Sequence, residues 1–278
     1  MTTAMERKVT FKLGDGVFSR DVAGETFFGD DHVLLDKDDN LLAGAPFEPQ
    51  GYVVGKLFDS ADDYVALQRC LTGELRRIMK EVGITTPDDF RIEQYHTFVD
   101  DKTHDEVAKK IQSGFSMSIF PFPVDTIEKR VSALIGTKVA CRYRKHEPER
   151  KFNLRVVRPK SNDNNPPHRD VWLDHLRDAV NIYVPLAGSS AESSLPIVPG
   201  SHHWMESEIE RTRAGARMGG QTFTVPCVTA AKRDVHFVRP NPGPNDLLVF
   251  SPYLIHGGGV NFQGEVTRAS LEARFWRG

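Results

Sequence analysis

The sequence contains little cysteine and no long apolar run. Its three cysteines, Cys70, Cys141 and Cys227, form neither a C-x-x-C pair nor a zinc-binding spacing. Such a sparse, odd-numbered set is typical of reduced thiols, so we expect a cytoplasmic protein without a disulfide framework. No stretch of about 18 apolar residues occurs, so we expect no transmembrane segment. The opening residues MTTAMERKVTFKLGDG also lack the apolar core of a secretory signal.

Neither sign of charge is in excess. The chain has 36 lysines and arginines against 38 aspartates and glutamates, which gives a net charge of −2. This balance predicts no basic surface, and we therefore expect no nucleic-acid partner. An apolar content of 39% is sufficient for a core, and a length of 278 residues suits one large domain.

The first half of the sequence predicts helices. Over residues 64–82, apolar side chains recur at steps of three and four, which places them on one face of a helix. Ser60 can cap the start of this helix and Gly83 can end it. The same pattern predicts a second helix over 125–136, and the Thr-Pro step at 86–87 predicts a further helix start.

The second half changes to a period of two, which is typical of strands. Alternating or strand-like runs occur at 138–144, 152–158, 180–186, 195–198, 222–228, 246–250 and 267–276. Helices followed by many short strands predict an α+β fold in which the strands close as a jelly-roll barrel. We expect one domain over 1–278, made of an extended N-terminal arm (1–50), a helical flank (51–136) and a β core (137–278).

A candidate metal site begins in the stretch PPHRDVW (166–172). It places His168 and Asp170 two residues apart after a rigid turn, a spacing that by itself is equally consistent with a surface turn. A second histidine, His256, follows an apolar run and precedes three glycines, which let the backbone pass close to another group. Two histidines and one carboxylate form the facial triad of non-haem Fe(II) oxygenases, whose open positions admit a cosubstrate and O₂. We therefore predict that these three residues bind Fe(II).

The strand TRASLEARFW (267–276) separates charged from apolar side chains. Arg268, Ser270, Glu272 and Arg274 share one face, whereas the residues between them are apolar or small. If the apolar face packs on the core, the charged face lines a wet cavity. Arg268 and Ser270 can then bind the far carboxylate of an α-keto acid. The alternative is an exposed edge strand with solvated charges.

Three motifs, in this order, resemble those of one family. HRD, LPIVPGSHHW (195–204) and IHGGGVNF with the following R-A-S step are similar to the phytanoyl-CoA dioxygenase family of Fe(II)/2-oxoglutarate enzymes. The resemblance implies a double-stranded β-helix, a cupin-like jelly roll, with flanking N-terminal helices. It also implies Fe(II), 2-oxoglutarate and O₂ as cofactors, with His168, Asp170 and His256 as iron ligands and Arg268 with Ser270 as the 2-oxoglutarate anchor. The implied reaction is hydroxylation with release of succinate and CO₂.

Three other side chains are candidates for the cavity wall. Asn181 and Tyr183 share one face of their strand, and Asn181 can bond the cosubstrate; buried structural hydrogen bonding is the alternative. Trp172 follows Asp170 by two residues and can wall the substrate pocket, or it can be an ordinary core residue.

A basic stretch points to the substrate. From 141 to 160 the chain has eight basic residues against two glutamates. Alternation predicts that Arg155 points into the barrel, and Arg158 lies near the same mouth. An unpaired buried cation is costly, so we expect an anionic, polar substrate: a sugar acid, a phosphorylated small molecule or a CoA thioester. The family resemblance adds the acidic sugar of lipopolysaccharide, Kdo. The alternative is that Arg155 pairs with Glu272 as part of the structure.

Two other functions fit the same fold. A barrel that binds a metal or a small acid without turnover would be expected to lack a metal ligand or the anchoring arginine, and this chain has both. A halogenase would carry a small residue in place of the ligand carboxylate, so Asp170 argues against that chemistry.

Overall fold

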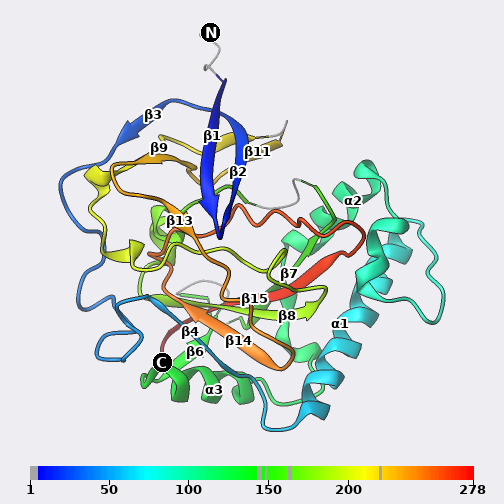
Figure 1. The fold of residues 1–278 in the computed structure, drawn as a ribbon. Helices are drawn as coiled ribbons and strands as arrows, with labels where there is room; N and C mark the ends of the chain where they lie inside the picture. The colour runs from blue at the N-terminus through cyan, green and yellow to red at the C-terminus, as the bar shows by residue number, and fades with distance from the viewer. Residues whose placement is uncertain (1–5, 143–145, 148, 162–164, 219–220) are drawn as a thin grey trace.

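A seven-stranded antiparallel sheet forms the centre of the protein in a computed structural model, which describes residues 6–142, 146–147, 149–161, 165–218 and 221–278. In spatial order its strands are β4 (Tyr52–Lys56), β14 (Asp246–Phe250), β8 (Ala179–Ala187), β15 (Arg268–Arg277), β7 (Lys151–Val157) and β5 (Phe115–Ser116), and β6 (Val139–Cys141) also pairs with β15. Figure 1 shows the three helices grouped around this sheet: α1 (Ala61–Glu81), α2 (Asp101–Gln112) and α3 (Asp125–Ile135).

The helix over 64–82 is confirmed as α1. Its first turn is capped because the Ser60 side chain accepts a hydrogen bond from the Asp62 backbone N–H at 3.1 Å, and Gly83 follows it with a φ of 87°. The helix predicted over 125–136 is confirmed as α3. The start predicted at 86–87 is wrong, because this step forms a single turn. A third helix, α2, is not predicted by the sequence pattern; the side chain of Asp100 caps it.

The sheet has an apolar face that packs on the helices and an opposite face that carries the polar row of β15. In β15 the apolar row packs in one core cluster with α1, α2 and α3, and the register places Leu271 opposite Leu154 of β7 and Val184 of β8. Because successive strand residues point to opposite sides, the polar row of β15 must face away from the helices. The central sheet therefore turns its polar face toward the second layer of strands.

That second layer consists of two smaller sheets. One has the order β11 (Gln221–Phe223), β10 (Ala216–Met218), β2 (Gly16–Ala23), β1 (Glu6–Leu13) and β13 (His236–Phe237). The other has the order β12 (Val228–Ala231), β9 (Ile209–Thr212) and β3 (Thr26–Phe28). The α+β jelly-roll fold predicted from the sequence is thereby confirmed.

Short 3₁₀ helices connect the strands. They are η1 (Ile92–Thr97), η2 (Met117–Ile119), η3 (Asp170–Trp172), η4 (Asp174–Leu176), η5 (Ser201–His203) and η6 (Glu206–Glu208). The run 195–198 is not a full strand and pairs only through single bridges of Ile197. Tyr143 and Arg144, within the predicted run 138–144, lie outside the described residues. None of the described helices is both long and apolar enough to cross a membrane.

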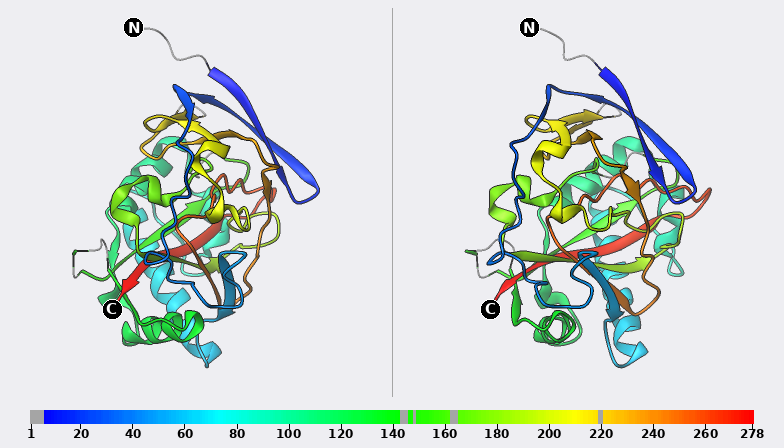
Figure 2. Two further views of the ribbon diagram at one scale, coloured as in Figure 1. Left: turned by 90° about the vertical axis from the view of Figure 1, so that its left-hand side faces the viewer. Right: turned by 60° about the vertical axis from the view of Figure 1, so that its left-hand side comes forward.

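The N-terminal segment is built into the second layer. Strands β1 and β2 form a hairpin that pairs with β13 on one side and β10 on the other. In both views of Figure 2 this hairpin lies at the end of the molecule away from α3. The residues predicted as an arm thus provide three strands of the second layer, β1, β2 and β3. The predicted helical flank likewise contributes an edge strand, β4, to the central sheet.

The hairpin is anchored by an aromatic cluster. Phe11, Phe18 and Phe237 have ring centroids 5.5 to 5.7 Å apart, and Phe18 is 4% exposed. Its neighbour Val17 is 67% exposed. The two positions therefore offer a matched pair of substitutions in one strand.

We predict that Phe18→Ala lowers the free energy of unfolding by about 3–5 kcal/mol, the usual cost of emptying a buried phenylalanine site. Val17→Ala should change it by less than about 0.5 kcal/mol. Urea unfolding of the two variants measures both values. Equal stabilities would show that the hairpin is not part of the cooperative core.

Candidate metal and cosubstrate site

The two segments that carry the candidate ligands are joined by their backbones. His168 and His256 form an antiparallel bridge in which each backbone N–H donates to the other's carbonyl at 2.9 Å. The two imidazole rings lie side by side, with centroids 4.4 Å apart. Asp170 follows on the same face as His168, so one backbone bridge brings all three side chains together.

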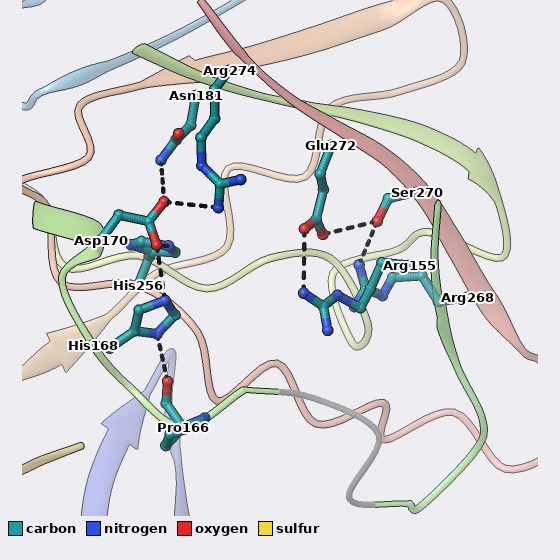
Figure 3. Close-up of polar contacts among 10 residues, drawn as sticks. All are labelled: Arg155, Pro166, His168, Asp170, Asn181, His256, Arg268, Ser270, Glu272 and Arg274. Carbon is teal, nitrogen blue, oxygen red and sulfur yellow. Dashed lines mark hydrogen bonds and ion pairs between the residues drawn. The ribbon is translucent and has the colours of Figure 1, made fainter. Parts of the chain in front are cut away.

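Their donor atoms converge on one point (Figure 3). The Nε2 atoms of His168 and His256 lie 3.1 Å and 3.8 Å from Oδ1 of Asp170, and all three side chains are buried. The Nδ1–H groups of the two histidines donate to the carbonyls of Pro166 at 2.7 Å and Leu254 at 2.9 Å. These bonds fix the tautomer, because a carbonyl can only accept, and they leave both Nε2 lone pairs free.

The second oxygen of Asp170 is already occupied. Oδ2 accepts a hydrogen bond from Nδ2 of Asn181 at 3.0 Å and lies 3.5 Å from the Arg274 guanidinium. Burial opposes ionisation, but the positive charge of the nearby Arg274 guanidinium favours it, and the pKa of Asp170 is held well below its usual range. Burial, reinforced by His168, lowers the pKa of His256 to about 4.

These side chains fit a divalent cation. Both Nδ1 protons are donated to carbonyls, so in the neutral rings each Nε2 atom is an electron-pair acceptor. These two nitrogens and the ionised Asp170 carboxylate face one another, and a cation bound between them stabilises this arrangement. All three lie beside a cavity of about 70 Å³. Two imidazoles and one carboxylate with an open side are the donor set of non-haem Fe(II) sites.

The glycine run after His256 has a steric cause. Gly257 has a φ of 98°, and a Cβ there would lie 2.6 Å from the carbonyl oxygen of Pro166. This is the carbonyl to which His168 donates, so the missing side chain allows the two ligand segments to approach.

A second candidate cluster contains Glu48, His202 and His203. Nε2 of His202 lies 2.9 Å from the backbone oxygen of Glu48, and His203 is paired with the Glu48 carboxylate at 3.1 Å. Two of its three side chains are not buried. The cluster ties the loop at 201–203 to residue 48 through the Nε2 atoms of both histidines, while Nδ1 of His202 is buried without a hydrogen-bond partner among the described residues.

Cationic groups lie along the polar face of β15. Arg268 is 2% exposed, and its Nη1 donates to Oγ of Ser270 at 3.0 Å, while its buried Nε has no hydrogen-bond partner among the described residues. The Ser270 hydroxyl lies 3.3 Å from Oε1 of Glu272. As predicted, the apolar row of β15 packs in the core with the helices, and its charged row lines the cavity.

Arg155 lines the cavity as its alternation predicted, but it does not lack a counter-ion. Its guanidinium lies 3.7 Å from Oε2 of Glu272 on the neighbouring strand (Figure 3). The expectation of an unpaired inward cation is therefore wrong, because the register of β7 and β15 brings Glu272 alongside.

Three other predicted residues lie away from the cavity wall. Arg158 turns outward to Asp101 of α2 at 2.9 Å, and Trp172 donates to Oε2 of Glu206 at 2.9 Å. Tyr183 lies deeper in the barrel, with its hydroxyl 2.9 Å from Oγ of Ser189 and the Arg268 guanidinium over its ring. Asn181 does line the cavity, but its amide holds Asp170.

The sequence analysis missed two amides and one ion pair. Asn153 and Asn165 line the cavity; Asn153 shares the strand face of Arg155 and could have been found by alternation. Arg169, between the candidate ligands His168 and Asp170, is fully buried and pairs with Glu206. Burial lowers the pKa of Arg169 to about 10, so it stays charged at neutral pH. Sequence spacing gives no signal for this distant partner.

Comparisons with known proteins found one matching family model and solved structures with a similar fold. The family model described as phytanoyl-CoA dioxygenase (PhyH) matches residues 47–268. The non-heme monooxygenase ThoJ, in its apo form, has a TM-score of 0.50 at 15% identity, covering 86% of this chain and 77% of its own. EctD from S. alaskensis with 2-oxoglutarate and 5-hydroxyectoine has a TM-score of 0.49 at 15% identity, with coverages of 91% and 84%. No curated protein matches the chain.

We predict that His168→Ala, Asp170→Ala and His256→Ala each weaken Fe(II) binding by more than the roughly 10- to 100-fold typical of losing a residue that only supports a ligand. His203→Ala, in the second cluster, should bind Fe(II) like the wild type. Anaerobic titration with Fe(II) measures each affinity. If all three of the first variants bound Fe(II) with the affinity of the wild type, these residues would not be the metal ligands.

Proposed function

Because this chain belongs to the phytanoyl-CoA dioxygenase family, we propose that it hydroxylates a small, polar, anionic molecule. It is a non-haem dioxygenase dependent on Fe(II), 2-oxoglutarate and O₂. Iron and cosubstrate supply the oxidation, in which 2-oxoglutarate is decarboxylated to succinate. The observation that carries the proposal is the convergence of His168, Asp170 and His256 beside a cavity lined by arginines.

Each side chain of the site has a defined role in this proposal. His168, Asp170 and His256 hold the metal, and Asn181 and Arg274 keep the Asp170 carboxylate oriented and ionised. Arg268 binds the far carboxylate of 2-oxoglutarate with its planar guanidinium, and the Ser270 hydroxyl supports it. The buried strands around them exclude water from the reacting centre.

The charge of the cavity supports an anionic substrate. Three arginines, Arg155, Arg268 and Arg274, face two carboxylates, Asp170 and Glu272. The side chains therefore carry one more positive than negative charge. A divalent metal and a dianionic cosubstrate cancel each other, so the loaded cavity keeps this positive excess. Such a field attracts anions. Suitable substrates are a sugar acid such as Kdo of lipopolysaccharide, or an acidic natural-product or CoA-type metabolite.

A non-catalytic barrel that binds a metal or a small acid is the second candidate. Only the hydroxylase would form more succinate when its substrate is added. A screen of sugar acids, phosphorylated metabolites, CoA thioesters and their neutral counterparts for this effect tests the proposal directly. The three cysteines are free thiols, two of them buried, which supports a cytoplasmic location.

Arg268→Ala should raise the 2-oxoglutarate concentration needed for half-maximal succinate formation by about ten- to a hundredfold, because a buried charge-assisted contact contributes about 1.5–3 kcal/mol. Iron binding should be unchanged. Arg277→Ala, at the exposed end of the same strand, serves as the control. An unaltered 2-oxoglutarate requirement in Arg268→Ala would assign the anchor to Arg274 instead.

Two substitutions at the Arg155–Glu272 pair test the substrate charge, because they should change the KM of an acidic substrate in opposite directions. Arg155→Ala should raise the KM of an acidic substrate by about tenfold, because it removes a charged contact. Glu272→Gln should lower that KM, because it frees Arg155 from its counter-ion. Neutral analogues should respond weakly to both. A best substrate that is a neutral lipid or an amine would refute the anionic assignment.

A further inference from the structure

A second, larger hollow adjoins the cavity beside the candidate metal ligands. It has a volume of about 610 Å³, against about 70 Å³ for the inner cavity. Asn153, Arg155 and Asn165 line both spaces. The outer groove runs from this junction between α2 on one side and the segment 221–225 on the other.

The two volumes decide what can occupy each space. A water position needs about 10–15 Å³ on this measure, so the inner cavity corresponds to roughly five to seven water molecules. The five-carbon dicarboxylate 2-oxoglutarate takes up that room. Under the proposed function, the molecule to be oxidised must therefore lie mainly in the outer groove and reach the metal past Arg155.

The chemistry of the groove walls narrows the class of that molecule. Among the described residues, its uncharged polar members are amides and hydroxyls: Gln112, Asn153, Asn165, Gln221, Thr222 and Thr224. Of the exposed charged residues of α2, the two that line the groove are Asp105 and Lys109, one of each sign. Amides both donate and accept, which matches the hydroxyls of a sugar. A polyphosphate would need several cations, and an acyl chain would need a mainly apolar wall.

We infer that the outer groove binds the saccharide part of an extended substrate, with an acidic sugar at its inner end beside Arg155. This inference rests on the proposed function and selects the sugar acid from among its candidates. A thioester of coenzyme A fits the groove less well, since the lysines and arginines lining it in the described part of the chain are Lys109 and the already paired Arg155.

The test uses substrates of increasing length and variants that fill the groove. Mono-, di- and trigalacturonate are titrated into the protein loaded with Fe(II) and 2-oxoglutarate under anaerobic conditions, so that binding is measured without turnover. Ala108→Trp and Gln112→Trp add bulk to the α2 wall at a half-buried and an exposed position. Glu106→Trp is the control, because this exposed residue of the same helix does not line the groove.

We expect trigalacturonate to bind the wild type and the Glu106→Trp variant at least tenfold more tightly than the monomer, and both groove variants to lose this gain. Three results would overturn the inference: no galacturonate binds, the trimer binds no better than the monomer, or both groove variants bind the trimer like the wild type. Tighter binding of coenzyme A than of trigalacturonate, abolished by Ala108→Trp, would also overturn the saccharide assignment.

A separate measurement distinguishes this inference from the proposed function. Slow conversion of 2-oxoglutarate to succinate without a second substrate needs only the inner cavity. It should be equal in the wild type and all three tryptophan variants. Its absence from the wild type, together with no succinate formation in the presence of any screened substrate, would refute the proposed function. Normal conversion together with unaltered trimer binding in the groove variants would refute the groove assignment alone.

Discussion

The electrostatics of three buried acceptor atoms control the centre of this protein. When the imidazoles are neutral, two ring nitrogens and one carboxylate oxygen face one another as acceptors, because both Nδ1–H groups donate to carbonyls and the second carboxylate oxygen accepts from Asn181. Buried acceptors without a donor are costly, and a cation relieves that cost. The surrounding backbone holds this arrangement in place: a two-way bridge joins the ligand segments, and Gly257 lets them approach.

A buried ion pair behind the candidate ligands fixes the segment that carries them. Arg169 sits between two predicted ligands, yet its side chain points away from them into a buried ion pair with Glu206. Its guanidinium also donates to the carbonyl oxygens of Ser201 and Trp204 in the following loop. A buried ion pair adds little net stability but fixes one geometry, because breaking it leaves an uncompensated charge. The segment 168–170 is thereby fixed by Arg169 on one side and by the hydrogen bond from Asn181 to Asp170 on the cavity side.

Charge compensation along the inner face determines what the cavity can receive. Arg155 is met by Glu272 and Arg274 by Asp170, while Arg268 has a neutral hydroxyl as its polar contact. Arg268 is therefore the cation best placed to take up an external carboxylate. The paired arginines can still contribute to the field, since opposite charges several ångströms apart cancel only partly. In the proposed function, this distribution places the cosubstrate carboxylate at Arg268 and the substrate beside Arg155.

The sequence by itself determined the elements whose signal is local. The caps and apolar period defined α1, strict alternation separated the two faces of β15, and three motifs indicated the family and the triad residues. Tertiary structure alone decided which groups pair across distance, as with Arg155 and Glu272, Arg158 and Asp101, or Trp172 and Glu206. Alternation tells which face a side chain takes but not which partner stands opposite, because that depends on the register between strands far apart in the chain.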